Sequence, residues 1–169
     1  PWYVQANMFT GVMSHPHFGN LQGFWPGLQA LWGDVAMASE TLQSFFRLWL
    51  HFRGRGVPER FHLASQAVVK GAEGYPLRPE LAESTYLMHE HAFQRGVSRN
   101  ASASSSWLSD AAAAVGVPHD VVVGGTVASS WLVAGREMVE ALNRTRVACG
   151  FAGVADIASG KLEDHMPSF

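Results

Sequence analysis

The chain has 169 residues, 47% of them hydrophobic and 15% charged, which is typical of a globular domain with an apolar core. Its formal net charge is -2 at pH 7, and its basic residues are scattered along the sequence. Binding to nucleic acid needs a basic face, so this charge pattern argues against a nucleic acid partner. No apolar run approaches the length of about 18 residues that a membrane-spanning helix requires.

The two ends of the chain and its single cysteine indicate a piece of a larger secretory-pathway protein. The chain starts at a proline and stops at Phe169 without a polar tail, so we expect it to be cut from a longer chain. Cys149 is the only cysteine and cannot form a disulfide bond within the chain. Its side chain is expected either to be buried among apolar residues or to pair with a thiol that lies outside this chain. Glycosylation sequons at Asn100 and Asn143 favour a secretory-pathway location.

Two helices are predicted in the first third of the chain. Hydrophobic residues recur there at three- and four-residue spacing, beginning after Pro26. Gly33 interrupts the pattern, and Asp34 is expected to cap a second helix that runs to about His51. Glycines and a proline then end that helix, and residues 59–75 are expected to form a loop.

Two more helices are predicted further on. Pro79 suits the first turn of a helix that runs to about Phe93, and another helix begins near Ser130. Residues 94–128 are dominated by Ser, Ala, Gly and Val, which predicts an inserted low-complexity loop. Residues 149–154 are expected to be extended or a turn. With no run of alternating strands in the sequence, we expect an all-α architecture.

The helix that follows Pro79 begins with two acidic residues and is preceded by an arginine. Glu80 and Glu83 are three residues apart, so both carboxylates project from one face of the first turn. The positive end of the helix dipole favours the ionised form of a carboxylate there, which suits a general base. Arg78 can hold a carboxylate or a sugar hydroxyl. Acids are common in the first turn of any helix, so the spacing alone favours an ordinary helix start.

Longer stretches of sequence favour a catalytic interpretation. Segment 75–87, which contains these three residues, closely resembles a signature of the glycoside hydrolase family 47 α-mannosidases. It is most similar to the branch called ER degradation-enhancing α-mannosidase-like proteins. Further segments resemble that branch in the same order along the chain, namely 1–11, 21–29, 57–61, 146–152 and 162–169.

The resemblance implies a fold and an activity. The family folds as an (α/α) barrel of seven helical hairpins, so the chain would be an arc of that barrel within a single catalytic domain. The family hydrolyses terminal α-1,2-linked mannose with inversion, aided by bound Ca²⁺. In this branch the substrate is the N-glycan of misfolded glycoproteins in the endoplasmic reticulum lumen, and an oxidoreductase is a possible partner.

The resemblance also assigns roles to individual residues. Glu80 corresponds to the general base, while Arg78 and Glu83 correspond to residues of the substrate and metal pocket. Phe169 matches an aromatic residue that lies against the sugar, and Glu59 matches a glutamate that supports the pocket. No metal ligand is expected within the chain, because the calcium-binding Thr would follow Phe169.

Some positions differ from the family pattern. Gly19 and Asn20 stand where this branch commonly has Asp-Ser. Asn20 can still form a hydrogen bond with a sugar, but Gly19 has no side chain with which to position one. The general acid would precede residue 1, so we expect the isolated chain to be inactive. These differences leave open a second hypothesis, that the protein binds high-mannose glycans without cleaving them, in the manner of a lectin.

Other candidate sites have simpler explanations. Histidines spaced two apart, such as His15 and His17, would point to different faces of a helix, so a zinc site is not expected. The aromatic residues at helical spacing are expected to lie in the core rather than stack on sugars. Trp25 is retained as a candidate contact because it adjoins Pro26, a proline that is expected to break the helix near the centre of the barrel.

Overall fold

The computed structural model describes residues 1–94, 130–147 and 150–163. Its helices there are α1 (Trp25–Trp32), α2 (Val35–His51), α3 (Glu80–Gln94) and α5 (Ser130–Arg144), with the 3₁₀ helix η1 (Asn20–Phe24) leading into α1. At the ends that were predicted, α2, α3 and α5 agree to within one residue with helices expected from the sequence. Helix α1 begins a few residues earlier than expected, and η1 was not predicted. The predicted loop at 94–128 lies almost entirely outside the described residues, as do Cys149 and Phe169.

The turn between α1 and α2 has the predicted capping chemistry. Gly33 ends α1 with φ of 100°, a left-handed conformation that glycine adopts without steric cost. Asp34 follows, and its carboxylate accepts a hydrogen bond from the backbone N–H of Met37 at 3.3 Å. The predicted role of Asp34 as the N-cap of the second helix is therefore confirmed.

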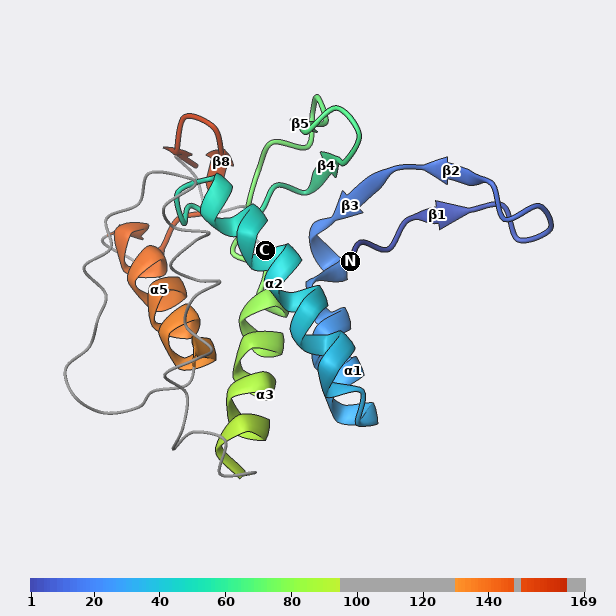
Figure 1. Ribbon diagram of the computed structural model, residues 1–169. Helices are drawn as coiled ribbons and strands as arrows, with labels where there is room; N and C mark the ends of the chain where they lie inside the picture. The colour runs from blue at the N-terminus through green and yellow to red at the C-terminus, as the bar shows by residue number, and fades with distance from the viewer. Residues whose placement is uncertain (95–129, 148–149, 164–169) are drawn as a thin grey trace.

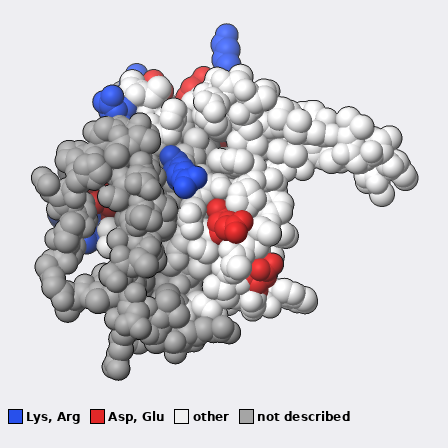
Figure 2. Space-filling view, viewed as in Figure 1, with Lys and Arg blue, Asp and Glu red and all other residues white. Residues whose placement is uncertain are grey.

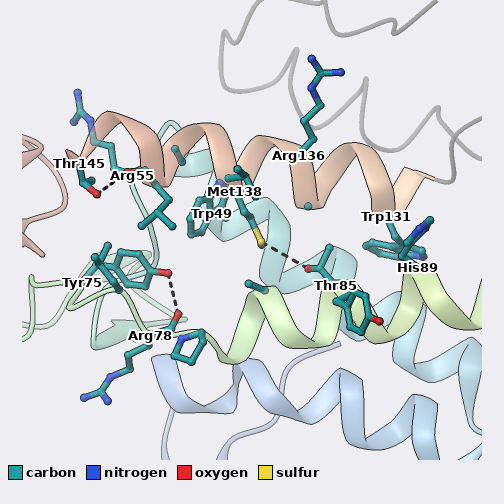
Figure 3. A pocket seen from close by; sticks show the side chains of 18 of the residues that line it. Trp49, Arg55, Tyr75, Arg78, Thr85, His89, Trp131, Arg136, Met138 and Thr145 are labelled. Atoms are coloured by element: carbon teal, nitrogen blue, oxygen red, sulfur yellow. Dashed lines mark hydrogen bonds between the residues drawn. The ribbon is translucent and has the colours of Figure 1, made fainter. Parts of the chain in front are cut away.

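The helices form two neighbouring pairs, α1 with α2 and α3 with α5 (Figure 1). Across the second pair, Trp131 lies near His89 at one end, and Thr85 contacts Met138 further along, so α3 and α5 are antiparallel (Figure 3). In the contact between the pairs, Gly23 lies against Leu81, and one turn later Gly27 lies against Ser84. Helices α1 and α3 therefore run side by side in the same direction, as adjacent hairpins of a helical arc do.

The contact between α1 and α3 is close because glycines line it. A Cβ atom at Gly23 would lie 2.9 Å from the backbone nitrogen of Leu81. The hydroxyl of Ser84 accepts a hydrogen bond from the Gly27 N–H at 2.9 Å and donates one to the Gly23 carbonyl at 2.6 Å. A side chain of α3 thus satisfies the Gly27 N–H in the first turn of α1 and also bonds the Gly23 carbonyl of η1.

The expectation of an all-α fold is wrong in part, because short antiparallel strands accompany the helices. They form four small sheets: β1 (Gln5–Ala6) with β2 (Met13–His15); β3 (His17–Gly19) with β4 (Arg60–His62) and β5 (Ala67–Val68); β6 (Arg146–Val147) with β7 (Gly150–Phe151); and β8 (Val154–Asp156) with β9 (Lys161–Leu162). Residues 59–75 are consequently not the plain loop that was expected. The extended segment expected at 149–154 corresponds to β7 and the start of β8.

The core is aromatic, and it joins the first helical pair to the sheet β3–β4–β5. Phe18, Phe45 and Phe46 are 0–1% exposed, and the rings of Phe18 and Phe45 lie 4.7 Å apart. Phe61 of β4 is also buried in this cluster. The aromatic residues that were expected to lie in the core at helical spacing are therefore core residues along α2. The expectation is wrong for Phe24, which is 45% exposed, and for Trp32, the last residue of α1, which is 88% exposed.

The space-filling view shows one face of the described residues (Figure 2). The hairpin β1–β2 projects from the body as an arm without charged side chains (Figures 1 and 2). Within the parts of the chain that are described, no helix has the length and apolar character needed to cross a bilayer.

Substituting Gly23 by Ala should destabilise the protein, because the new methyl group would collide with the backbone of α3 rather than with a movable side chain. We expect a loss of about 1–3 kcal/mol in the free energy of unfolding, measured by denaturant titration. Gly135→Ala is the matched control, since a Cβ atom there meets only Thr85 Cγ2, at an ordinary 3.8 Å. Equal stability of the two variants would show that the close helix contact is not required.

Candidate functional site

Helix α3 begins at Glu80, immediately after Pro79, as the sequence predicts. The backbone N–H of Glu83 donates to the Pro79 carbonyl at 2.8 Å, which closes the first turn. The Oε2 atom of Glu80 is buried and has no hydrogen-bond partner among the residues that the structure describes. A buried carboxylate oxygen without a partner is costly, so its presence favours a bound water or ligand at that atom.

Arg78 is held beside this carboxylate by an ion pair with Glu59. Its Nε donates to Glu59 Oε1 at 2.7 Å and its second nitrogen, Nη2, donates to Oε2 at 3.2 Å. This two-point contact fixes the plane of the guanidinium group. The bond to Glu59 is also the main reason that the pKa of Arg78 is raised, with the charge of Glu80 adding to the effect. Glu59 and Arg78, 19 residues apart in sequence, are thus brought together next to Glu80.

Tyr75 is a further residue of this site, and sequence reasoning did not assign it a role. Its hydroxyl donates to the Arg78 carbonyl at 2.9 Å and so fixes the loop that leads into α3. Burial raises the pKa of Tyr75 to about 12, and the nearby Glu80 contributes to the increase. The hydroxyl therefore keeps its proton, and remains a donor, throughout the physiological pH range. Its position three residues before Arg78 carries no periodic signal that would reveal this contact.

Asn20 and Gly19 lie at the edge of the same region. The Asn20 side chain is 3% exposed, and its amide donates to the Val57 carbonyl at 2.8 Å. Its backbone N–H donates to the Glu59 carbonyl at 3.1 Å. Asn20 therefore joins η1 to the segment that carries Glu59. A Cβ atom at Gly19 would meet nothing closer than that same carbonyl, at 4.0 Å.

The remaining predicted site residues are placed differently. Glu83 is exposed, one turn along α3 from Glu80. Phe169 lies outside the described residues. The ring centroids of Trp25 and Tyr3 are 5.5 Å apart, and the buried indole nitrogen of Trp25 has no hydrogen-bond partner in the described parts of the chain.

A cavity of about 500 Å³ lies next to this region, between α3 and α5 (Figure 3). Its lining includes Tyr75, Trp131 and Met138 and is largely apolar, while Glu59, Glu80 and Glu83 are absent from it. Arg78 borders it, but the guanidinium group extends away from α5 (Figure 3). Because the predicted catalytic carboxylates do not reach this cavity, we place the candidate site at the start of α3.

The described residues do not by themselves make a metal centre. No group of three or more His, Cys, Asp or Glu side chains among them is arranged to hold a metal ion. Calcium takes six to eight oxygen ligands, so Glu80 and Glu83 alone do not complete a calcium site.

The sequence of this chain is similar to a protein family and to individual known proteins. Residues 2–95 match the family model for glycosyl hydrolase family 47. Alpha-mannosidase I MNS4 of Arabidopsis thaliana is 37% identical over 170 residues, a match that covers 100% of this chain and 22% of that protein. Human ER degradation-enhancing alpha-mannosidase-like protein 2 is 32% identical over 169 residues, covering 99% of this chain and 23% of that protein.

A more distant relative, ER degradation-enhancing alpha-mannosidase-like protein 1 of Saccharomyces cerevisiae, is 27% identical over 187 residues, covering 99% of this chain and 19% of that protein. The chain thus spans 19–23% of the length of these curated relatives. The family match includes Glu59, Arg78, Glu80 and Glu83. Together these findings confirm the resemblance seen in the sequence: the chain belongs to glycosyl hydrolase family 47, a family of glycosidases that includes α-mannosidases.

Proposed function

We propose that this chain supplies the general base of an inverting α-1,2-mannosidase. The single observation that carries the proposal is the buried, unpartnered Oε2 of Glu80 at the start of α3. Beside it, Arg78 is oriented by Glu59, so a fixed positive group lies next to the carboxylate. Family membership supports glycoside hydrolysis as the chemistry of this arrangement.

In this mechanism Glu80 accepts a proton from a water molecule while that water attacks the anomeric carbon of mannose. The bond from that carbon to the leaving oxygen breaks, and the leaving oxygen takes a proton from the general acid. Inversion requires a second carboxyl group on the other side of the sugar, far enough away to leave room for the water. That general acid is proposed to lie outside this chain. Arg78 is proposed to hold a sugar hydroxyl, while Glu59 and Tyr75 hold Arg78 in place.

The proposed substrates are high-mannose N-glycans on misfolded glycoproteins in the endoplasmic reticulum lumen. The names of the relatives, which refer to ER degradation and α-mannosidase, support this assignment. An oxidoreductase partner is proposed on the resemblance alone. Ca²⁺ is proposed for the complete domain, with most of its ligands outside the described residues, and the role given to Glu80 does not depend on it.

Replacing Glu80 by Gln in the full-length protein should abolish mannose removal, because an amide cannot accept the proton from water. Mass spectrometry of a high-mannose N-glycan incubated with the protein and Ca²⁺ measures the successive loss of single hexoses. We expect the rate to fall by a factor of about 10²–10⁴, the usual contribution of a general acid or base.

Glu90→Gln, which makes the same change on the same helix nearly three turns from Glu80, is the control and should leave the rate unchanged. Full activity of Glu80→Gln would exclude Glu80 as the base. If the wild-type protein binds the glycan and leaves it intact, the lectin-like hypothesis is favoured instead.

Replacing Arg78 by Lys should weaken substrate positioning with little effect on stability. Lysine keeps the charge but loses the two-point contact with Glu59. Because this ion pair is about one-third exposed, the free energy of unfolding should change by less than about 1 kcal/mol. We expect kcat/KM for the glycan to fall at least about tenfold, which corresponds to about 1.4 kcal/mol of lost transition-state stabilisation. A large loss of stability with unchanged kcat/KM would give Arg78 a purely structural role.

A further inference from the structure

The hairpin formed by β1 and β2 is an exposed arm that plays no part in the candidate site. The first Asp, Glu, Lys or Arg of the sequence is Asp34, so residues 1–33 contain no charged side chain of these types. Residues 1–15 are all exposed, and the hairpin projects from the helical body with its turn at the far end (Figure 1). An exposed apolar projection of this kind indicates an interaction surface.

The base of the arm is anchored to the body. The Trp2 ring packs against the rings of Phe18 and Phe45, and both centroid separations are 5.3 Å. The Tyr3 hydroxyl accepts a hydrogen bond from Nε2 of Gln29, on α1, at 2.8 Å. These contacts hold the segment before β1 against the core and α1, so the arm leaves the body at a fixed place.

Large apolar side chains are concentrated at the tip of the arm, around the turn between β1 and β2. Met8 and Phe9 are 85% and 87% exposed, while Val12 and Met13 are 66% and 54% exposed. Removing apolar surface from water is favourable in free energy, and it needs no particular direction of contact. The tip therefore gains free energy from any apolar surroundings that it can enter.

The backbone N–H groups of the turn have partners within the turn itself. The side-chain oxygen of Asn7 accepts the N–H groups of Phe9 and Thr10, at 2.9 and 3.0 Å. The Asn7 carbonyl accepts the Gly11 N–H, and the Asn7 N–H donates to the Val12 carbonyl, both at 2.8 Å. The Val12 N–H donates to the Thr10 hydroxyl at 3.3 Å. Because these donors do not depend on water, the cost of moving the turn into an apolar medium is lowered.

Three features of the tip favour a lipid surface over a protein as its partner. A stable protein interface uses about 20–30 residues on each side, whereas the tip offers four large apolar side chains. The tip is the end of a narrow arm, and a fluid bilayer has no fixed shape that it must match. The arm has no charged side chain to attract an acidic or basic protein surface (Figure 2), which suits headgroups without net charge.

We propose that the tip of the β1–β2 arm inserts into a zwitterionic lipid bilayer and holds the protein at the membrane surface. Met8 and Phe9 enter the boundary between the headgroups and the acyl chains, about 5–10 Å deep, as interfacial segments do. Because the arm has no charged side chain, binding depends on apolar burial and does not require anionic lipid. The arm separates the helices from the bilayer, so the candidate site stays in water.

Sedimentation of the full-length protein with phosphatidylcholine vesicles tests this proposal. The wild-type protein should bind the vesicles. Its half-maximal lipid concentration should change less than about twofold when about 20% phosphatidylserine or about 0.5 M NaCl is added, because the arm offers no charge to attract or screen. Combining Met8→Ser with Phe9→Ser should raise that lipid concentration at least about tenfold, since two large apolar side chains no longer leave water.

The matched control combines Leu31→Ser with Trp32→Ser. These two adjacent apolar residues are 71% and 88% exposed at the end of α1, on the helical body rather than on the arm. The control should bind vesicles as the wild-type protein does. All four substituted side chains are exposed, so both double variants should remain folded, which circular dichroism checks.

Several results would overturn the proposal. They are a wild-type protein that does not bind the vesicles, binding that requires phosphatidylserine, and an equal loss of binding in the two double variants. Self-association of the wild-type protein without lipid, abolished by Met8→Ser with Phe9→Ser in analytical ultracentrifugation, would identify a second copy of the protein as the partner instead. Vesicle binding is measured without glycan, so none of these results bears on the mannosidase proposal.

Discussion

The close contact between α1 and α3 is the constraint on which the rest of the structure depends. Gly23 and Gly27 allow the backbones to approach, and Ser84 joins the two helices through hydrogen bonds to both glycines. Glu80 is one turn before Ser84 on α3, so the contact that aligns the helices also sets the position of the carboxylate. The predicted base is thereby built on a helix in fixed contact with its neighbour rather than on an unsupported loop, as a precise site requires.

A second set of contacts brings residues from the loops to the same point. Asn20 joins η1 to the segment that precedes β4, and Glu59 of that segment holds Arg78. Tyr75 then fixes the carbonyl of Arg78. Each of these contacts joins two different elements of the fold. The small sheets, which were not predicted from the sequence, therefore help to position the site.

Much of the helical framework could be predicted from sequence, because helix periodicity and capping are local. Asp34 shows this, since its capping role needs only the residues that follow it. The short strands could not be predicted in this way. Strands of two or three residues are too short to show alternation, and the partner of β3 is about forty residues away. At the site, Glu80 and Arg78 were found from a local signature. Their contacts with Glu59 and Tyr75 depend on the fold, and only Glu59 was anticipated, through its resemblance to a family residue.

The central claim is that Glu80 faces the substrate as a base. A structure of the full-length Glu80→Gln protein with an uncleaved α-1,2-linked mannose disaccharide tests it most directly. The account predicts an ordered water about 2.6–3.2 Å from the side chain of residue 80, lying on the face of the anomeric carbon opposite the leaving oxygen. A disaccharide bound elsewhere, with residue 80 facing bulk solvent, would contradict it.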